Sequence, residues 1–312
     1  MKSDYKLAVL LSAYNGEKYI DQQIQSILKQ KNIKNITLII RNDGSTDSTA
    51  KILEKYSSNF ANIKILNEHN IGLVKSFFKL LEYSFNEGFD YYAFCDQDDY
   101  WLPDKLISAV NLLSKEDDNI PLLYGSCSIL ADKNLNSSNK TTQKLIRPIT
   151  FYNSAIQNIC PGHTQVLNKK LAEKLLNNFS EDMKFYSQDL WITNVATVTG
   201  KIIFDNQPHV LYRMHGNNEL GYGQGKISRL KEHIHRLKQN ECKLMSLQLK
   251  EFIDCFGDYL TITEKEEMNK FFSSQKNIIN RMKYSINTKL YRQTKKETLA
   301  FKILYIFGAY NI

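Results

Sequence analysis

The sequence predicts an α/β protein in which a Rossmann-like, mostly parallel sheet is flanked by helices and followed by a mainly helical C-terminal region. Three observations support this prediction. Short apolar runs alternate with segments of helical period over residues 6–95, three of the runs end in polar turns, and no strand signal follows Gly221. Strands and helices that alternate in this way build right-handed units of a parallel sheet. With 312 residues, 42% of them hydrophobic, the chain can bury the core of one large domain or two smaller ones.

The first strand is predicted over residues 6–12, where KLAVLLS is an apolar run that ends in small residues. After a turn, Ile20, Ile24 and Ile27 recur at i, i+4 and i+7, which predicts a helix with one apolar stripe. The alternation then continues with strands over residues 36–41, 63–67 and 91–95, a helix over about 47–57, and a helix that carries Val74, Phe77, Phe78 and Leu81.

The pattern is less regular beyond Pro103. It predicts a helix over about 104–115, a strand over 121–130, a polar loop over 131–144, a helix after 162–168 and short closing strands over 201–204 and 209–213. The glycine-rich stretch GYGQG begins at Gly221 and precedes Lys-rich sequence of helical period. We therefore expect one domain over residues 1–220, in halves of about 1–102 and 103–220, and a helical region over 221–312.

The composition narrows the class of partner without choosing one. A formal net charge of +8 and a pI near 9.0 favour an anionic partner such as nucleic acid, an acidic membrane or a phosphorylated substrate. The lysines are spread along the chain without a recognisable nucleic-acid module, so we do not expect nucleic acid. The five scattered cysteines form no C-x-x-C pair, which argues against a disulfide framework or a zinc cluster and favours a reducing cytosol. The apolar run at the N-terminus is too short for a signal peptide or a membrane span.

Polar turns follow three of the predicted strands: SAYNGE after the first, RNDGSTD after the second and DQDD after the fourth. Because ligands of parallel α/β sheets bind beyond the carboxyl ends of the strands, these turns are expected at one binding edge. Asp96 and Asp98 carry hard oxygen ligands that suit Mg²⁺ or Mn²⁺, although acids at this place also stabilise the start of a following helix. Asp43 is placed to accept a hydrogen bond from a base or a ribose, although Asn-Asp-Gly-Ser is also a good turn.

The segments SAYNGEKYIDQQIQSIL, IIRNDGSTDST, NIGLVKSF and DQDD together resemble the nucleotide-diphosphate-sugar binding half of a family 2 glycosyltransferase with the GT-A fold. The resemblance extends over about the first 215 residues and keeps the order of the family's motifs. DQDDYWLPDKL, QDLWI and LYRMHGNN are similar to the bacterial rhamnosyltransferase-like branch, which builds cell-surface polysaccharides. The resemblance makes residues 1–102 the nucleotide-sugar half and residues 103–220 the acceptor half of a catalytic domain.

The resemblance also implies roles for single residues. The nucleotide and the donor sugar are bound by Ala13, Tyr14, Glu17, Asp43, Asn70, Lys75, Asp96 and Gln97. Asp98 and His215 are the implied ligands of a divalent cation, Mn²⁺ or Mg²⁺, and the role of Asp99 is left open. Lys75 is also consistent with a surface lysine on a helix.

Asp189, in SQDLWI, is the implied catalytic base, because a sugar hydroxyl needs a group that takes its proton during attack. Members of the family often have Glu or His before this acid, so Gln188 leaves its hydrogen-bonding partner open. An N-cap role for Asp189 is the alternative. The acceptor or donor-sugar side is expected to include His163, Gln188, Trp191 and Arg213, of which His163 also fits a turn and Arg213 a structural role at a strand end.

The implied reaction is an inverting transfer of a sugar from dTDP-rhamnose or a UDP-hexose to a hydroxyl of a glycan, lipid-linked or glycoprotein acceptor. A sugar-1-phosphate nucleotidyltransferase is a competing hypothesis, but the turn SAYNGEKY lacks the glycine-rich basic loop expected there. Two non-enzymatic functions also compete: a non-catalytic polyanion-binding protein, suggested by the charge, and a sugar-nucleotide binding module without catalysis. The presence of Asp96, Asp98 and Asp189 argues against the binding module.

The C-terminal region suggests contact with a membrane or with protein. KISRLKEHIHRLKQ is basic with a helical period, and AFKILYIFGAYNI is apolar and aromatic but shorter than the roughly 20 residues that cross a bilayer. An interfacial helix would hold the protein at the anionic cytoplasmic leaflet of the plasma membrane. Packing of the tail onto the helical region, or onto a second subunit in a homodimer, is the alternative.

Overall fold

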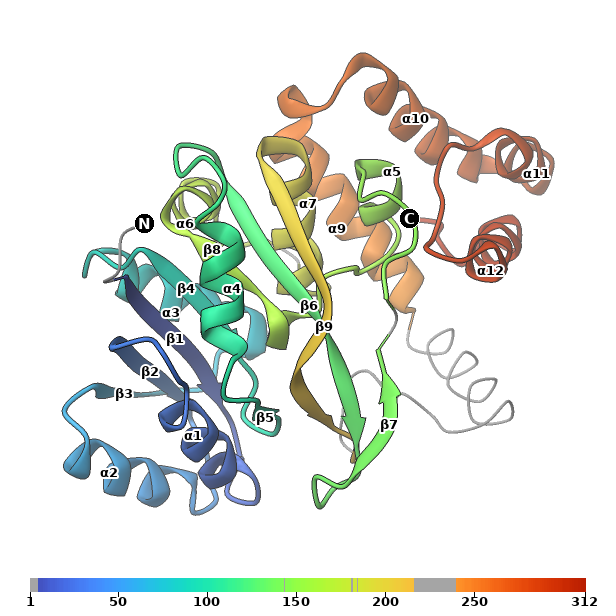
Figure 1. Cartoon of the computed structure of the whole chain (residues 1–312). Helices are drawn as coiled ribbons and strands as arrows, with labels where there is room; N and C mark the ends of the chain where they lie inside the picture. Colours follow the sequence, from blue (N-terminus) through green and yellow to red (C-terminus); the bar gives the residue numbers. More distant parts are fainter. Residues whose placement is uncertain (1–4, 143, 181, 184, 216–239) are drawn as a thin grey trace. The chain divides into compact units, whose positions relative to one another are not determined.

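A computed structural model describes residues 5–142, 144–180, 182–183, 185–215 and 240–312 (Figure 1). The chain divides into two compact units, each built from separate stretches of sequence. Unit 1 comprises Met1–Lys144, Cys160–Glu181 and Gly200–His215, and unit 2 comprises Leu145–Ile159, Asp182–Thr199 and Gly216–Ile312. The predicted boundary at residues 220 and 221, the GYGQG stretch and the basic stretch at 226–239 lie outside the described residues.

Unit 1 contains a nine-stranded sheet in the order β3-β2-β1-β4-β8-β6-β9-β5, with β7 paired to β6. The strands are β1 (Lys6–Ala13), β2 (Asn35–Asp43), β3 (Ile63–Glu68), β4 (Tyr91–Cys95), β5 (Tyr100–Trp101), β6 (Leu122–Ala131), β7 (Ser137–Thr141), β8 (Val166–Asn168) and β9 (Lys201–Arg213). The first four strands are parallel, as predicted. Beyond β4 the sheet is mixed, because β8 runs antiparallel to both β4 and β6 while β9 runs parallel to β6.

The second half of the sheet differs from the prediction in two places. The two short closing strands predicted over 201–204 and 209–213 form one strand, β9, whose register against β6 shifts between the pairs Ser126–Asp205 and Cys127–Pro208. A bulge of this kind absorbs the polar residues that looked like a break in the sequence. The polar loop predicted over 131–144 contains the short strand β7.

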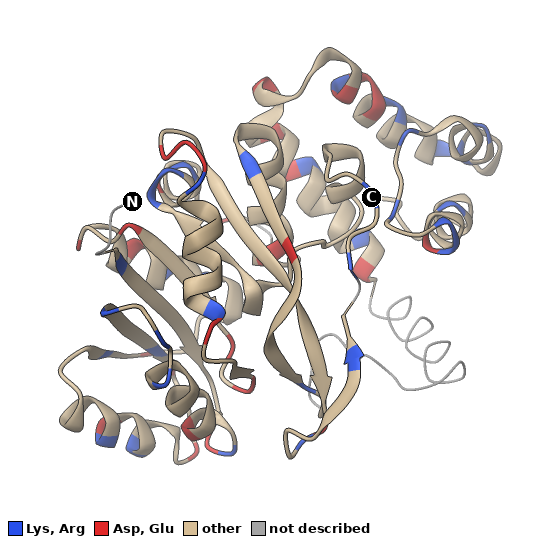
Figure 2. Cartoon of the chain, in the orientation of Figure 1, with Lys and Arg blue, Asp and Glu red and all other residues tan. Residues whose placement is uncertain are grey.

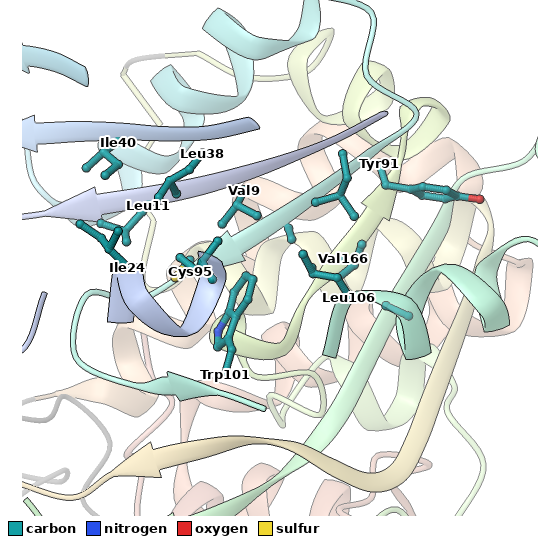
Figure 3. Packing of buried hydrophobic residues seen from close by; sticks show 14 of the residues in the cluster. Val9, Leu11, Ile24, Leu38, Ile40, Tyr91, Cys95, Trp101, Leu106 and Val166 are labelled. Atoms are coloured by element: carbon teal, nitrogen blue, oxygen red, sulfur yellow. The ribbon is translucent and has the colours of Figure 1, made fainter. Parts of the chain in front are cut away.

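Helices cover both faces of this sheet. They are α1 (Ile20–Leu28), α2 (Thr49–Asn59), α3 (Leu73–Phe85), α4 (Lys105–Leu113), η1 (Gly162–Thr164) and α6 (Lys169–Leu176). Side chains of β1 alternate between the faces. Val9 and Leu11 join Ile24 and Trp101 in one buried cluster (Figure 3), whereas Ser12 on the other face hydrogen-bonds Ser76 of α3, with 2.6 Å between their hydroxyl oxygens.

Unit 2 is helical where it is described. Its helices are α5 (Phe151–Ser154), α7 (Gln188–Thr199), α9 (Glu241–Phe256), η2 (Gly257–Tyr259), α10 (Ile262–Ser273), η3 (Ser274–Lys276), α11 (Ile278–Asn287) and α12 (Lys295–Ile306). Aromatic side chains form much of its core. Phe301, Tyr305 and Tyr310 of the C-terminal tail are buried and lie in one ring cluster with Phe271 and Tyr284. These three aromatic residues of the tail therefore pack within the helical unit, in line with the second interpretation of the tail, whereas Phe307 is exposed.

The described helices include none that combines the length and the apolar character of a membrane span. Cys95, Cys127 and Cys160 are buried, and Cys242 and Cys255 are half-buried.

Candidate active site

The turns after β1 and β4 are joined at the carboxyl edge of the sheet by the side chain of Gln97. The backbone N–H of Tyr14 donates to Gln97 Oε1 at 2.9 Å, and Gln97 Nε2 donates to the Tyr14 carbonyl at 3.0 Å. The pairing continues the sheet beyond the last residues of β1, where Ala13 is buried. The ring of Tyr14 is about half exposed at this edge. Gln97 therefore holds the covering loop predicted at Tyr14 against the acidic turn.

The turns after β1 and β2 are bonded to each other as well. The backbone N–H of Ser48 donates to Glu17 Oε2 at 2.9 Å, and the backbone N–H of Glu17 donates to Asp47 Oδ2 at 3.1 Å. Asn15 Oδ1 accepts a hydrogen bond from the Thr46 N–H at 2.8 Å. The Glu17 carboxylate therefore helps to hold the turns after β1 and β2 together, because it accepts a backbone N–H at the start of α2.

Asp43, the predicted reader of the nucleobase, is buried at the end of β2 and makes several bonds. Its carboxylate accepts hydrogen bonds from the backbone N–H groups of Ile71 and Gly72, at 2.8 and 3.0 Å, and forms a short ion pair with buried Arg41. These bonds fix the loop that leads into α3. Exposed Asn70, a predicted nucleotide contact, lies in this loop, and half-buried Lys75, another, lies in the first turn of α3.

The acidic turn Asp96–Asp99 connects β4 to β5. Asp98 Oδ2 lies 2.8 Å from His215 Nε2, so the two predicted metal ligands are direct neighbours. The ring of His215 stacks on Tyr19, with 5.1 Å between ring centroids. Asp98 and His215 are far apart in the sequence and meet because β5 pairs with β9, which ends two residues before His215.

Asp99, whose role the sequence left open, is fully buried. Its Oδ1 accepts the backbone N–H of Arg213 at 3.1 Å, and its Oδ2 has no hydrogen-bond partner among the described residues. Burial, together with the charges of Asp98 and Asp96, raises the pKa of Asp99 well above its usual range. A cation bound beside Asp99 would favour the ionised form of this buried carboxyl group.

His163, predicted on the acceptor or donor-sugar side, is buried close to the acidic turn. Its Nδ1 is 3.9 Å from Asp99 Oδ2, and its Nε2 is 2.7 Å from Ser128 Oγ. Burial, with a smaller effect of the Lys105 charge, lowers the pKa of His163 to about 3, so the imidazole is neutral. Ligand atoms of Asp96, Asp99 and His163 all lie within 4.8 Å of one another. Hard carboxylate oxygens and a neutral imidazole are a suitable donor set for Mn²⁺ or Mg²⁺.

Arg213 holds the acidic turn in place. Its guanidinium donates to the carbonyls of Asp98 and Lys133, at 2.6 and 2.7 Å, and to Gln22 Oε1 at 2.7 Å. The side chain is buried, and it stacks over the Tyr19 ring at 4.4 Å. The contacts of Arg213 therefore support the structural role given as its alternative, and not the predicted contact with a sugar.

Lys105 is a buried cation close to this turn that the sequence did not reveal. Its Nζ lies 3.7 Å from the centroid of the Trp101 ring and has no hydrogen-bond partner in the part of the chain that the structure describes. Burial lowers the pKa of the Lys105 ammonium to about 7. A lysine at the start of a helix looks like an ordinary surface residue, so no signal in the sequence indicated its burial.

Asp189, the predicted base, belongs to unit 2 and lies in the first turn of α7. Its carboxylate accepts short hydrogen bonds from Asn158 Nδ2 and Ser187 Oγ, and also accepts the Leu190 N–H at 2.9 Å. Ser187 Oγ accepts the same N–H at 3.2 Å, so Ser187 shares in capping the helix. Asn158 is thus a hydrogen-bonding partner of Asp189. The sequence had left this partner open, because Gln188 stands where members of the family often have Glu or His.

Two neighbours of Asp189 were expected to contact a sugar. Trp191 is 1% exposed and packs edge-on against Phe185, Phe252 and Phe256, so it is a core residue and its assignment to the acceptor side is not supported. Gln188 is also buried. Asp189 is half-buried, between buried Gln188 and buried Leu190.

Comparisons with known proteins agree with this arrangement. The family model described as Glycosyl transferase family 2 matches residues 8–176. The chain is 30% identical over 219 residues to the dTDP-rhamnosyl transferase RfbG of Shigella flexneri, covering 68% of this chain and 73% of the relative. It is 32% identical over 180 residues to the UDP-Glc:alpha-D-GlcNAc-diphosphoundecaprenol beta-1,3-glucosyltransferase WfgD of Escherichia coli, covering 57% of this chain and 64% of the relative.

Solved structures are similar over almost the whole chain. A structure of S. aureus TarS with UDP matches with a TM-score of 0.57 at 17% identity, covering 98% of this chain and 89% of that one. The mannosyltransferase PcManGT from Pyrobaculum calidifontis, in complex with GDP-Man and Mn²⁺, matches with a TM-score of 0.50 at 13% identity, covering 99% and 86%. These likenesses confirm the predicted fold, a GT-A sheet with a helical C-terminal part.

Proposed function

Because the chain belongs to glycosyltransferase family 2, we propose that it transfers a sugar from a nucleoside-diphosphate sugar to an acceptor hydroxyl, with inversion at the anomeric carbon. The observation that carries the proposal is the set of three bonded turns at the carboxyl edge of β1, β2 and β4. Asp43 and the acidic turn Asp96–Asp99 follow two of these strands at one edge of the sheet, which is where parallel α/β sheets bind nucleotides.

The donor is proposed to be dTDP-rhamnose or a UDP-hexose. The two relatives named above are described as a dTDP-rhamnosyl transferase and a UDP-Glc glucosyltransferase, at 30% and 32% identity. Asp43, Tyr14 and the loop carrying Asn70 are proposed to contact the nucleoside, and Lys75 is proposed to approach the diphosphate. The sugar-1-phosphate nucleotidyltransferase hypothesis has no support from the family match.

A divalent cation, Mn²⁺ or Mg²⁺, is proposed as the cofactor. The residues fit it, because buried Asp99 Oδ2 lacks a hydrogen-bond partner among the described residues and lies within ligand distance of Asp96 and His163. Asp98 of the same turn and His215, which follows β9, form a second acid–imidazole pair. Either group of side chains would supply ligands to the cation. When bound, it would neutralise the charge that develops on the departing nucleoside diphosphate.

Asp189 is proposed as the general base that accepts the proton of the acceptor hydroxyl. A carboxylate held by Asn158 and Ser187 has a fixed orientation, which a proton acceptor in a single displacement requires. The proton moves from the hydroxyl to a carboxylate oxygen as the new glycosidic bond forms and the bond to the nucleoside diphosphate breaks.

The acceptor is proposed to be a glycan, a lipid-linked sugar or a glycoprotein, and the protein is proposed to work in the cytoplasm with peripheral contact to the inner face of the plasma membrane. The name of WfgD includes a diphosphoundecaprenol acceptor, which is consistent with a lipid-linked acceptor here. A homodimer, the alternative partner of the C-terminal tail, stays a prediction.

The experiment that tests the proposed function measures nucleoside diphosphate released from dTDP-rhamnose and UDP-glucose in the presence of Mn²⁺ and a lipid-linked acceptor. We expect Asp98→Asn to reduce turnover at least about 100-fold, because it removes a negative charge from the cation site. Asp258→Asn, at a fully exposed residue of unit 2, is the matched control and is expected to leave turnover unchanged. Full metal-dependent turnover in Asp98→Asn would show that the acidic turn has another role.

A further inference from the structure

The C-terminal stretch of residues 274–312, which includes α11 and α12, is strongly basic. Residues 274–312 contain eight Lys and Arg and a single acid, Glu297, which gives +7 of the formal net charge of +8. The preceding stretch of the same unit, residues 240–273, contains seven Asp and Glu against four Lys and is therefore acidic, at −3. Figure 2 colours the positions of Lys and Arg blue along α11 and α12. Five of the eight basic residues belong to these two helices: Arg281 and Lys283 to α11, and Lys295, Lys296 and Lys302 to α12.

Glu297, the single acid of this stretch, helps to start α12. Its side chain accepts hydrogen bonds from the Thr294 N–H at 3.1 Å and the Thr294 hydroxyl at 2.9 Å, in the capping box that starts α12. Lys276, Lys283, Lys289, Lys295 and Lys296 are exposed. Within the described part of the chain, these five lysines form no ion pair with an acid.

The same helices expose an unusual number of large apolar side chains. On α11, Ile278, Met282 and Ile286 recur at i, i+4 and i+8 and are 48, 49 and 76% exposed, with Ile279 beside them at 62%. On α12, the exposed apolar residues are Leu299, Ile303 and Phe307, again at i, i+4 and i+8, at 59, 45 and 78%. Each helix buries its opposite face, through Tyr284 on α11 and through Phe301 and Tyr305 on α12. Both are amphipathic helices whose apolar stripe faces solvent.

The two helices are in direct contact with each other. The Tyr284 and Tyr305 rings lie 4.9 Å apart, and the Arg281 guanidinium donates to the Ile306 carbonyl at 2.8 Å. This bond ties the C-terminal end of α12, next to Phe307, to the middle of α11. The pair presents apolar stripes flanked by lysines, which is the composition of an interfacial element that binds anionic lipid.

We propose that the exposed faces of α11 and α12 are a docking surface for an anionic phospholipid bilayer. The apolar side chains would enter the interface between headgroups and acyl chains, while the exposed lysines would lie against lipid phosphates. A second copy of this chain is less favoured as the occupant, because two surfaces of strong positive charge would repel each other. This inference names the surface that would make the proposed peripheral contact with the membrane. It rests on that contact, which is one part of the proposed function. It does not depend on sugar transfer.

The test is flotation of the full chain with vesicles of phosphatidylcholine alone and of phosphatidylcholine mixed with phosphatidylglycerol, without donor or acceptor. We expect binding to the anionic vesicles only, and weaker binding as salt is raised. Ile286→Ser is expected to weaken binding about tenfold, since burying an isoleucine side chain is favourable by roughly that factor. Lys283→Gln is expected to weaken it about fivefold, the contribution of one lysine near an anionic membrane.

Matched controls lie on α10, in the acidic part of the same unit. Ile262 is 78% exposed, like Ile286, and Lys265 is exposed, so Ile262→Ser and Lys265→Gln should leave binding unchanged. Equal effects of Ile286→Ser and Ile262→Ser would overturn the proposal, as would equal binding to both kinds of vesicle. A dimer in light scattering that Ile286→Ser converts to monomers, without vesicle binding, would overturn it in favour of a second copy. Because no substrate is used, none of these results bears on transferase activity.

Discussion

Asp189 is the residue on which the proposed chemistry depends most directly. We expect Asp189→Asn to lower kcat by about 10²- to 10⁴-fold, because the amide cannot accept the proton of the acceptor hydroxyl. Nucleotide affinity should be unchanged, since the residue belongs to unit 2 and the nucleotide contacts are assigned to unit 1. Steady-state kinetics and calorimetry with the nucleotide separate the two quantities.

Asp254→Asn is the control for this prediction, because Asp254 is an exposed acid on α9 of the same unit. It should keep both kcat and nucleotide affinity. If Asp189→Asn kept full kcat, Asp189 would be only a residue at the start of α7, held by Asn158 and Ser187 for structural reasons.

Lys105 predicts a pH dependence of stability. In the unfolded chain a lysine keeps its proton up to about pH 10.4, whereas burial lowers the pKa of folded Lys105 to about 7. Between these values the unfolded state binds more protons, so the free energy of unfolding rises with pH. Between pH 7 and pH 9, the free energy of unfolding of the unmodified chain should rise by about 2 kcal/mol relative to that of Lys105→Met, measured by urea denaturation.

Lys115→Met controls for the loss of a lysine that is exposed just beyond the end of α4. The difference in the free energy of unfolding between Lys115→Met and the unmodified chain should be the same at pH 7 and at pH 9. A Lys105→Met difference that did not change with pH would mean that Lys105 stays protonated in the folded protein.

Sequence motifs singled out candidate site residues, but no sequence pattern indicated which of the other residues near the site would be buried. Asp43, Asp98 and His215 were found from their motifs, and the structure places Asp98 beside His215. Burial of Lys105 and the approach of His163 to Asp99 depend on how β8 and α4 pack in the sheet unit, which no spacing in the sequence encodes. The burial of Trp191 was missed for the same reason, because an aromatic residue beside an acid is consistent with a sugar contact or with a core position.

At the scale of elements, the turn after β2 depends on a glycine. Gly44 has a φ of +73°, and a Cβ there would meet the backbone nitrogen of Asn70 at 2.8 Å. We expect Gly44→Ala to destabilise the protein by about 2–4 kcal/mol, from backbone strain and from displacement of the loop before α3. Nucleotide affinity should fall as well, because that loop is held by Asp43.

The substitution Gly88→Ala separates the effect of backbone strain from the effect of displacing the loop before α3. Gly88 has a similar φ of +76°, but a Cβ on Gly88 would meet nothing within 4 Å, so Gly88→Ala carries backbone strain alone. It should cost about 1 kcal/mol and leave nucleotide affinity unchanged. Thermal unfolding and calorimetry of the two variants make the comparison, and equal losses in both would argue against the packing of Gly44 on Asn70.

The elements of the first half follow from local signals, and those of the second half do so less clearly. In β1 to β4, continuous apolar runs and helical stripes repeat with regular spacing, and the predicted strands match within about two residues. In β9, the stretch Asn206–Pro208 looked like a break between strands, but the pairing with β6 continues past it through a bulge. Pairing between strands distant in sequence, such as β6 with β9, cannot be read from local patterns.

At the scale of the whole molecule, the two compact units do not coincide with consecutive halves of the sequence. Residues 145–159 and 182–199 belong to the helical unit although they lie between strands of the sheet unit. The division therefore assigns Asp189 and Trp191 to the unit that also contains α9 to α12. Composition indicated a mainly helical C-terminal region but gave no sign that it would include these two earlier segments.

The central claim is that the acidic turn binds a nucleoside diphosphate together with a divalent cation, and calorimetric titration tests it most directly. UDP, dTDP, GDP and CDP are each titrated into the full chain with Mn²⁺, with Mg²⁺ and with EDTA. We predict that one nucleotide family binds with a cation, that EDTA weakens binding at least about tenfold, and that Asp98→Asn does the same. Absence of binding by all four nucleotides with either cation, or equal binding in EDTA, would contradict the claim.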